Sequence, residues 1–67
     1  MKLIDTPNPN AKKILFDQKN EDISNSLKKV QGVSSVFFGP GFITITKKNN
    51  FEWEVITEDI VNIFDKL

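Results

Sequence analysis

The chain has 67 residues and a mass of 7.7 kDa, which allows one small domain, residues 1–67, and no more. It contains no cysteine and no histidine, so disulfides, zinc sites and thiolate-ligated iron–sulfur clusters are excluded within the chain. Nine lysines balance nine carboxylates and arginine is absent, a charge pattern that argues against a nucleic-acid binder, which normally carries a basic excess.

The first sixteen residues predict two strands and a connector of restricted shape. Lys2 to Ile4 is a short apolar start that can pair as a strand, and Ala11 to Phe16 is a second strand with imperfect alternation. The segment between them holds two prolines and two asparagines. Proline fixes its own φ and restricts the residue before it, and asparagine favours turns. We expect an ordered connector that joins the strands or, through Pro7 and Asn8, contacts a partner.

A polar turn at Asp17 to Asn20 leads into a predicted helix from Glu21 to Gln31. Three apolar residues form one stripe at helical spacing: Ile23, Leu27 and Val30. Acidic residues at the amino end and lysines at the carboxyl end suit the helix dipole. Gly32 then provides a left-handed stop.

Val33 to Phe38 and Phe42 to Lys47 predict a β-hairpin, because β-branched and aromatic residues dominate both segments. The intervening Gly39-Pro40-Gly41 is a turn sequence in which glycine permits positive φ. It lacks the lysine and the following helix that a phosphate-binding loop needs.

A second amphipathic helix follows the break at Lys48 to Asn50. Its apolar residues recur at spacings of three and four: Trp53, Ile56, Ile60, Ile63, Phe64 and Leu67. The β-branched residues near its start weaken the first turn, and Thr57 precedes two acids as an N-cap does. Regular helix is therefore expected to begin at Thr57, with Trp53 as a core anchor.

The element order is ββαββα, which predicts an α+β two-layer sandwich: a four-stranded antiparallel sheet with both helices on one face. No apolar run reaches the roughly 18 residues that span a bilayer, and the start does not resemble a signal peptide. We expect a soluble, cytoplasmic protein.

The alternation in the hairpin places two aromatic side chains on the sheet face opposite the helices. Ile43 and Ile45 are the natural residues to bury, which sends Phe42 and Thr44 to the other side together with Phe37. An apolar patch rimmed by polar groups is a common mark of an interaction site. The alternative is that the rings lie flat as cross-strand partners that stabilise the hairpin.

The search for catalytic chemistry finds little. Without histidine or cysteine the usual nucleophile–base pairs are unavailable, and a serine–lysine pair on the first helix is better explained as a solvated face. Carboxylates at Glu52, Glu54 and Asp59 offer oxygen ligands for a hard cation, but helix-start acids are the simpler account. We therefore predict no enzyme activity, no catalytic residue and no metal or cofactor ligand in this chain.

Three segments carry a resemblance to a known family. Thr6 to Lys12 resembles the TPNPN-x-x-K/L-F opening of the amino-terminal domain of NifU-like (Nfu) iron–sulfur scaffold proteins. Gln31 to Lys47 is similar to that family's EGVKSVFFGPDFITVTK segment, and Glu52-Trp53 with Ile56 and Ile60 is similar to its DW-x-x-L-K-P-x-I helix. The match is ordered and covers nearly the whole chain.

The chain also departs from the family pattern. The stretch before the first helix is shorter, Gly41 stands where the family has aspartate, and Glu58 stands where it has proline. The family's carboxyl-terminal domain with its CxxC pair is not in this sequence, so the chain is expected to be a stand-alone relative or an excised piece.

The resemblance implies a non-catalytic accessory module of iron–sulfur cluster assembly or delivery. It would dock a CxxC-bearing scaffold domain or an iron–sulfur client, with the cluster on that partner and no nucleic acid or membrane involved. The residues expected to contact the partner are Phe37, Phe42, Thr44, Pro7 and Asn8. Two other possibilities stay open: an iron-binding protein that uses carboxylate ligands, and a structural relative without an assembly role.

Overall fold

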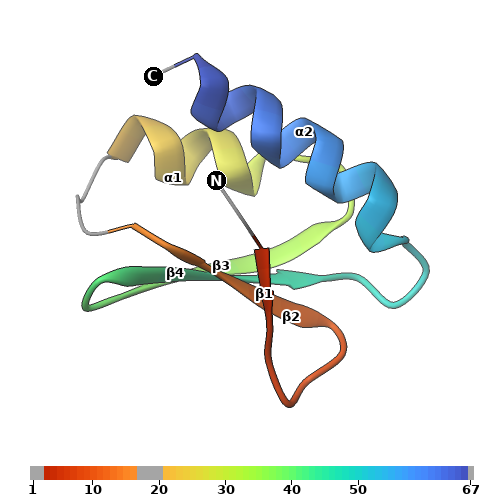
Figure 1. Ribbon diagram of the computed structural model, residues 1–67. Helices are drawn as coiled ribbons and strands as arrows, with labels where there is room; N and C mark the ends of the chain where they lie inside the picture. Colours follow the sequence, from red (N-terminus) through yellow and green to blue (C-terminus); the bar gives the residue numbers. More distant parts are fainter. Residues whose placement is uncertain (1–2, 17–20, 67) are drawn as a thin grey trace.

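The computed structural model describes residues 3–16 and 21–66. It contains four strands and two helices in the order ββαββα (Figure 1). Their bounds are β1 Leu3–Asp5, β2 Ala11–Leu15, α1 Glu21–Lys28, β3 Val33–Gly39, β4 Phe42–Lys47 and α2 Trp53–Asp65. The predicted polar turn at 17–20 lies outside the described residues.

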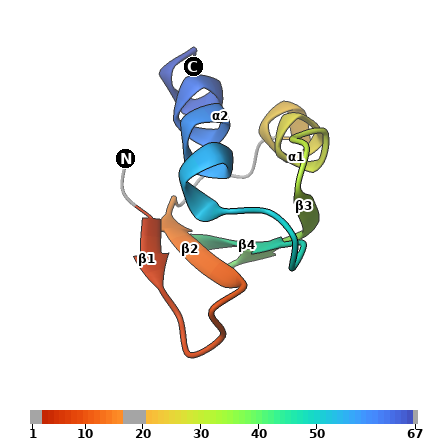
Figure 2. The ribbon, with the colours of Figure 1, turned by 90° about the vertical axis from the view of Figure 1, so that its right-hand side faces the viewer.

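The strands form one antiparallel sheet in the order β1-β2-β4-β3. Both helices lie on the same side of this sheet, α1 above β3 and α2 above the other strands (Figure 2). The predicted α+β two-layer sandwich is thereby confirmed. The side of the sheet that faces away from the helices is called the outer face below. Neither described helix is long and apolar enough to cross a membrane.

The core lies between the sheet and the helices and consists mainly of branched aliphatic residues. Strands contribute Ile14, Ile43 and Ile45, and α2 contributes Ile56 and Ile60, all with at most 1% of their surface exposed. The α1 stripe adds Ile23, Leu27 and, just beyond the helix, Val30. Two isoleucines on alternate positions of β4 thus point inward, as the hairpin pattern predicted, because successive strand residues face opposite sides.

Several predicted bounds are wrong by a few residues at the ends of elements. Strand β1 runs to Asp5, which pairs with Lys12 across the ladder, instead of ending at Ile4. Helix α1 ends at Lys28 and not at Gln31. The chain turns there because the Val30 side chain enters the core and its C=O accepts from the Val33 N–H at 3.1 Å.

The largest difference from the prediction is at the start of α2. The helix begins at Trp53, after an extended Glu52, and Thr57 lies inside it instead of capping it. The β-branched run is tolerated because Ile56 is fully buried and Trp53 packs against the core. Tertiary packing therefore overrides the weak helix propensity of this first turn.

The hairpin between β3 and β4 closes through Pro40 and Gly41. Gly41 has φ of +77°, the left-handed conformation that glycine adopts without strain, whereas Gly39 has no positive φ. Gly32 also has positive φ (+97°), but α1 already ends at Lys28, so Gly32 does not stop the helix as predicted.

Candidate interaction surface

The outer face carries a group of side chains that we call the outer-face cluster: Lys13, Leu15, Phe37, Phe42 and Thr44. The sheet register aligns them in two neighbouring rows. Lys13 pairs with Thr44, which pairs with Phe37, and Leu15 pairs with Phe42. Three adjacent strands therefore contribute to one surface, and its apolar members lie toward the β3–β4 turn.

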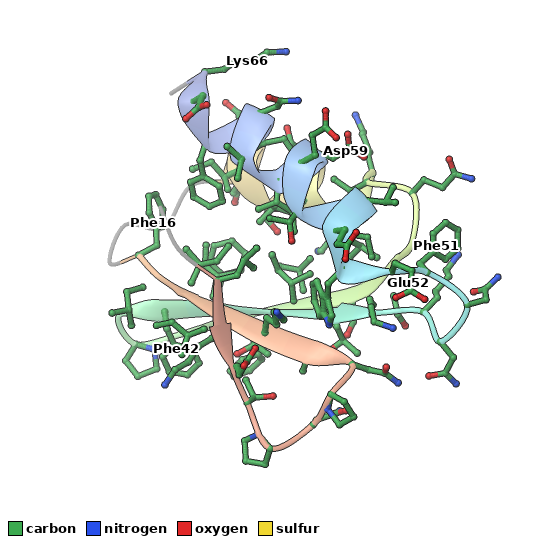
Figure 3. All side chains as sticks on the ribbon, turned by 45° about the vertical axis from the view of Figure 1, so that its right-hand side comes forward. Phe16, Phe42, Phe51, Glu52, Asp59 and Lys66 are labelled. Carbon is green, nitrogen blue, oxygen red and sulfur yellow. The ribbon has the colours of Figure 1, made fainter. Side chains whose placement is uncertain are left out.

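The Phe42 ring lies across the sheet at this end. It covers Gly39, since a Cβ built on that glycine would fall 2.6 and 2.7 Å from two ring carbons of Phe42. Its centroid is 6.4 Å from that of Phe37, with the two rings tilted by 46°. The Lys13 Nζ lies 5.9 Å from the same ring, within cation–π range. Figure 3 shows Phe42 on the side of the sheet opposite the helices.

The cluster is exposed where it is most apolar. Leu15 and Phe37 keep 68% and 62% of their surface accessible, and Phe42 is half-buried. Within the described ranges, the only other strongly exposed large apolar side chain is Val55 on α2, in the other layer. Leu15 and Phe37 flank Phe42, so the outer face presents a short apolar patch with one lysine beside it.

The predicted orientation of these residues is confirmed, since Phe37 and Phe42 share the outer face while Val36 and Phe38 pack against the core. The contact between the two rings also shows that they are cross-strand neighbours, which the alternative of a pair that stabilises the hairpin requires. Sequence reasoning did not include Leu15 in the site. Its adjacency to Phe42 follows only from the pairing of β2 with β4.

The connector between β1 and β2 is held by short-range hydrogen bonds. The Thr6 hydroxyl is within donating distance of Ala11 O (2.8 Å) and Asn8 O (2.9 Å) and also accepts from the Asn8 N–H (3.2 Å). The Asn8 Oδ1 accepts from the Asn10 N–H at 2.9 Å, an Asx turn. These hydrogen bonds restrict the backbone of the segment, whose order stays a prediction, while Pro7 and Asn8 are exposed.

A long-range contact that sequence reasoning missed ties the connector to α2. The Trp53 Nε1 donates to Pro9 O at 2.9 Å, and Lys12 Nζ lies 5.5 Å from the centre of the same indole. Lys12 also forms an ion pair with Asp5 at 3.2 Å. The predicted core anchor therefore has a second role as a clamp on the connector. No local signal reveals it, because the partners are 44 residues apart.

The five residues predicted to contact a partner fall into two regions. Phe37, Phe42 and Thr44 belong to the outer-face cluster. Pro7 and Asn8 line a hollow of about 320 Å³ next to Ala11, at the opposite end of β2 from Leu15. The structure therefore offers two separate surfaces instead of one continuous site.

Within the described part of the chain, no group of three or more acidic, histidine or cysteine side chains comes together in a way that could hold a metal ion. The carboxylates of Glu52, Glu54 and Asp59, considered above as oxygen ligands, are exposed along the amino-terminal part of α2. The geometry gives no support to a carboxylate iron site formed by these residues.

Comparison with known proteins gives consistent matches. A family model described as "Scaffold protein Nfu/NifU N terminal" matches residues 1–67. The human protein named "NFU1 iron-sulfur cluster scaffold homolog, mitochondrial" is 36% identical over 73 residues, which cover 84% of this chain and 29% of that protein. "Conserved virulence factor C" of Staphylococcus aureus (strain bovine RF122 / ET3-1) is 32% identical over 74 residues, covering 88% and 20% respectively. The chain thus spans less than a third of the length of these curated relatives.

Two solved structures share the fold. The crystal structure of protein SAV1430 from Staphylococcus aureus superimposes with a TM-score of 0.83 at 25% identity, covering 96% of this chain and 95% of that one. The solution structure of SeR13 from Staphylococcus epidermidis gives a TM-score of 0.68 at 27% identity, covering 98% and 94%. The family match over the whole sequence and these likenesses agree with the motifs around the connector and the hairpin, and the chain belongs to the Nfu/NifU amino-terminal family.

Proposed function

We propose that this chain is a non-catalytic interaction module of iron–sulfur cluster assembly or delivery. It docks a protein that carries the cluster, such as a CxxC-bearing NifU-type scaffold domain, or an iron–sulfur client. Family membership and the name of the human relative support the connection with iron–sulfur clusters. The cluster belongs on the partner because this chain has neither cysteine nor histidine to ligate it.

The observation that carries the proposal is the outer-face cluster. Antiparallel sheets tolerate one solvated face, but that face is normally polar. Here Leu15 and Phe37 are exposed beside Phe42, while both helices cover the opposite face. Apolar side chains gathered on one surface and rimmed by threonine, serine and lysine are typical of a docking site.

The cluster also suggests the chemistry of the contact. Aromatic and aliphatic side chains provide apolar area for a partner residue to cover, and fully burying one such side chain contributes about 1.5–3 kcal/mol. Lys13 is the one charged residue in the cluster, and its Nζ lies 5.9 Å from the centre of the Phe42 ring. A carboxylate on the partner would pair with it at the rim. We further propose a cytoplasmic location, in line with the cysteine-free composition.

The test is a titration of the ¹⁵N-labelled chain with a purified CxxC scaffold domain, both without and with its cluster. We expect amide shifts to concentrate on β2, β3 and β4 at the outer face. Leu15→Ser and Phe37→Ser each remove exposed apolar surface and should weaken binding while the spectrum stays folded. Val55→Ser is the matched control, because it removes an exposed apolar side chain from the helical layer.

Equal binding by the two outer-face variants and the wild type would show that this face is structural only. Loss of binding by Val55→Ser alone would move the docking site to the helices. No shift with either form of the scaffold domain, at concentrations up to the millimolar range, would refute docking to this class of partner.

A further inference from the structure

The two edges of the sheet differ in how well they are protected against pairing with another strand. Strand β1 has only three residues, ends at the charged Asp5 and is followed closely by Pro7. Short length, charge and proline are the usual devices that blunt an edge. Strand β3, at the other edge, has seven residues, VSSVFFG, with no charge and no proline. Its one irregularity is a bulge between Val33 and Ser35, at its start.

The direction of the backbone groups in β3 follows from bonds around its neighbour β4. The Lys47 N–H donates to Asn10 O at 2.7 Å, on the β2 side, and the Lys48 N–H donates to Gly32 O at 2.7 Å, on the β3 side. Alternate residues of an antiparallel strand turn their backbone groups to opposite neighbours. Even-numbered residues of β4, such as Thr44, therefore bond to β3.

Thr44 pairs with Phe37, so the backbone of Phe37 is used within the sheet. The residues on either side, Val36 and Phe38, turn their N–H and C=O groups away from β4, toward the free edge. Within the described ranges, no other segment forms a hydrogen bond to these groups. An open row of two donors and two acceptors remains, spaced for an added strand.

Side chains flank this row on both faces of the sheet. Phe37 is exposed on the outer face, while Val36 and Phe38 pack against the core and are only half-buried, because they lie at the edge. Helix α1 runs above β3 (Figure 2). Its Ile23 and Leu27 face the core and Ser26 lines a hollow shared with α2.

Rotation of about 100° per residue therefore places Ser24 and Lys28 on the opposite flank of α1, over the free edge. An added strand would thus meet Phe37 on one side, and the half-exposed apolar edge with a polar helix flank on the other.

We infer that the free edge of β3 binds an extended segment of a partner protein, which adds to the sheet as a fifth strand. This inference rests on the proposed function and names how the partner engages. Backbone hydrogen bonds to Val36 and Phe38 supply the pairing. An aliphatic or aromatic residue of the segment packs beside Phe37, which continues the outer-face cluster across the new strand.

The size of the site favours an extended peptide segment over a second copy of this chain. The regular part of the edge is short, and a stable protein–protein interface usually buries about 1,200–2,000 Å². The edge offers two backbone donors, two backbone acceptors and three apolar side chains. A set of contacts of this size is typical of the recognition of one extended peptide segment. The absence of charge and proline along β3 leaves the edge open to such a segment.

The first measurement is amide hydrogen exchange in the free, full chain. The Phe37 N–H, bonded within the sheet, should exchange slowly, whereas the Val36 and Phe38 N–H groups should exchange at least about tenfold faster. Equal protection of all three in the free chain at low concentration would mean that the edge is already occupied, and would overturn the inference.

The second measurement uses a defined probe, the tightest-binding 12-residue peptide selected from a random displayed library against the immobilised wild-type chain. Val36→Pro removes an edge-facing N–H without breaking the ladder to β4. Val36→Ala is its matched control, since both variants lose the valine side chain and only the proline variant loses the donor. We expect Val36→Pro to bind the peptide at least about tenfold more weakly than Val36→Ala, and the peptide to slow exchange at Val36 and Phe38 in the wild type.

Equal binding by the two Val36 variants, or peptide shifts confined to Leu15 and Phe42, would overturn the inference. Protection of the edge that appears on raising the chain concentration without peptide, with a dimer in sedimentation, would also overturn it in favour of a second copy. If Val36→Pro does not fold, the wild-type complex provides the test: slower exchange of the Val36 and Phe38 amides with peptide supports the inference, and unchanged exchange overturns it. The two variants also separate this inference from the proposed function. If Leu15→Ser loses binding to the scaffold domain and Val36→Pro keeps it, strand addition at the β3 edge is refuted while the proposed function stands.

Discussion

The packing of Phe42 on Gly39 predicts that Gly39→Ala destabilises the wild type but stabilises a chain that lacks the Phe42 ring. Gly39 has no positive φ, so alanine fits its backbone, and in a strand alanine is favoured over glycine by about 0.5–1 kcal/mol. In the wild type, however, the new Cβ would lie 2.6 and 2.7 Å from two ring carbons of Phe42. The ring must then leave its position over the glycine.

Overpacking of this kind typically costs about 1–3 kcal/mol. Gly39→Ala should therefore lower the free energy of unfolding of the wild type by up to about 2 kcal/mol, after the strand preference is subtracted. In the Phe42→Ser background the ring is absent, and Gly39→Ala should raise the free energy of unfolding by about 0.5–1 kcal/mol. The coupling energy between the two sites should be about 1–3 kcal/mol.

Urea unfolding followed by the fluorescence of Trp53, the only tryptophan, measures all four members of this double-mutant cycle. Gly39→Ala stabilising both backgrounds equally would mean that the ring does not rest on Gly39, and would return Phe42 to a freely exposed side chain. A coupling of the expected size shows that the fold itself holds the ring in the outer-face cluster.

Three further outcomes are expected. Trp53→Phe should destabilise the chain by about 1 kcal/mol, because it removes the donor to Pro9 O, and faster amide exchange at Ala11 and Asn10 would accompany it; unchanged stability would contradict the clamp. Ile60→Ala should cost about 2–5 kcal/mol, since this side chain is fully buried, and far-UV circular dichroism should show a largely unfolded population; a cost below about 1 kcal/mol would contradict the packing. Reconstitution with iron and sulfide should give no charge-transfer absorption, and a stoichiometric brown holoprotein would contradict the lack of ligands.

Local patterns were sufficient for the element order and for the two faces of the hairpin. Ile43 and Ile45 alternate with Phe42 and Thr44, and a strand has no freedom to place neighbours on the same side. The side of the sheet on which Phe37 lies therefore followed from the sequence. The prediction of both helices on one face followed from connections too short for another arrangement.

Element ends were less predictable, because they depend on contacts with distant residues. The β-branched run after Trp53 disfavours helix locally, yet burial of Ile56 outweighs a propensity difference of a few tenths of a kcal/mol per residue. Helix α1 stops early for a related reason, since the Val30 side chain is used in the core beyond the helix.

The sequence by itself determined the fold class, the family and the outward direction of Phe37 and Phe42, since these depend on residue type and on spacing along the chain. The order of strands in the sheet was decided only in the tertiary structure. Pairing of β2 with β4 brings Leu15 to Phe42, leaves β3 at an open edge and lets Trp53 reach Pro9. These contacts join residues far apart in the chain, and no local pattern encodes them because only burial of the shared core selects which strands become neighbours.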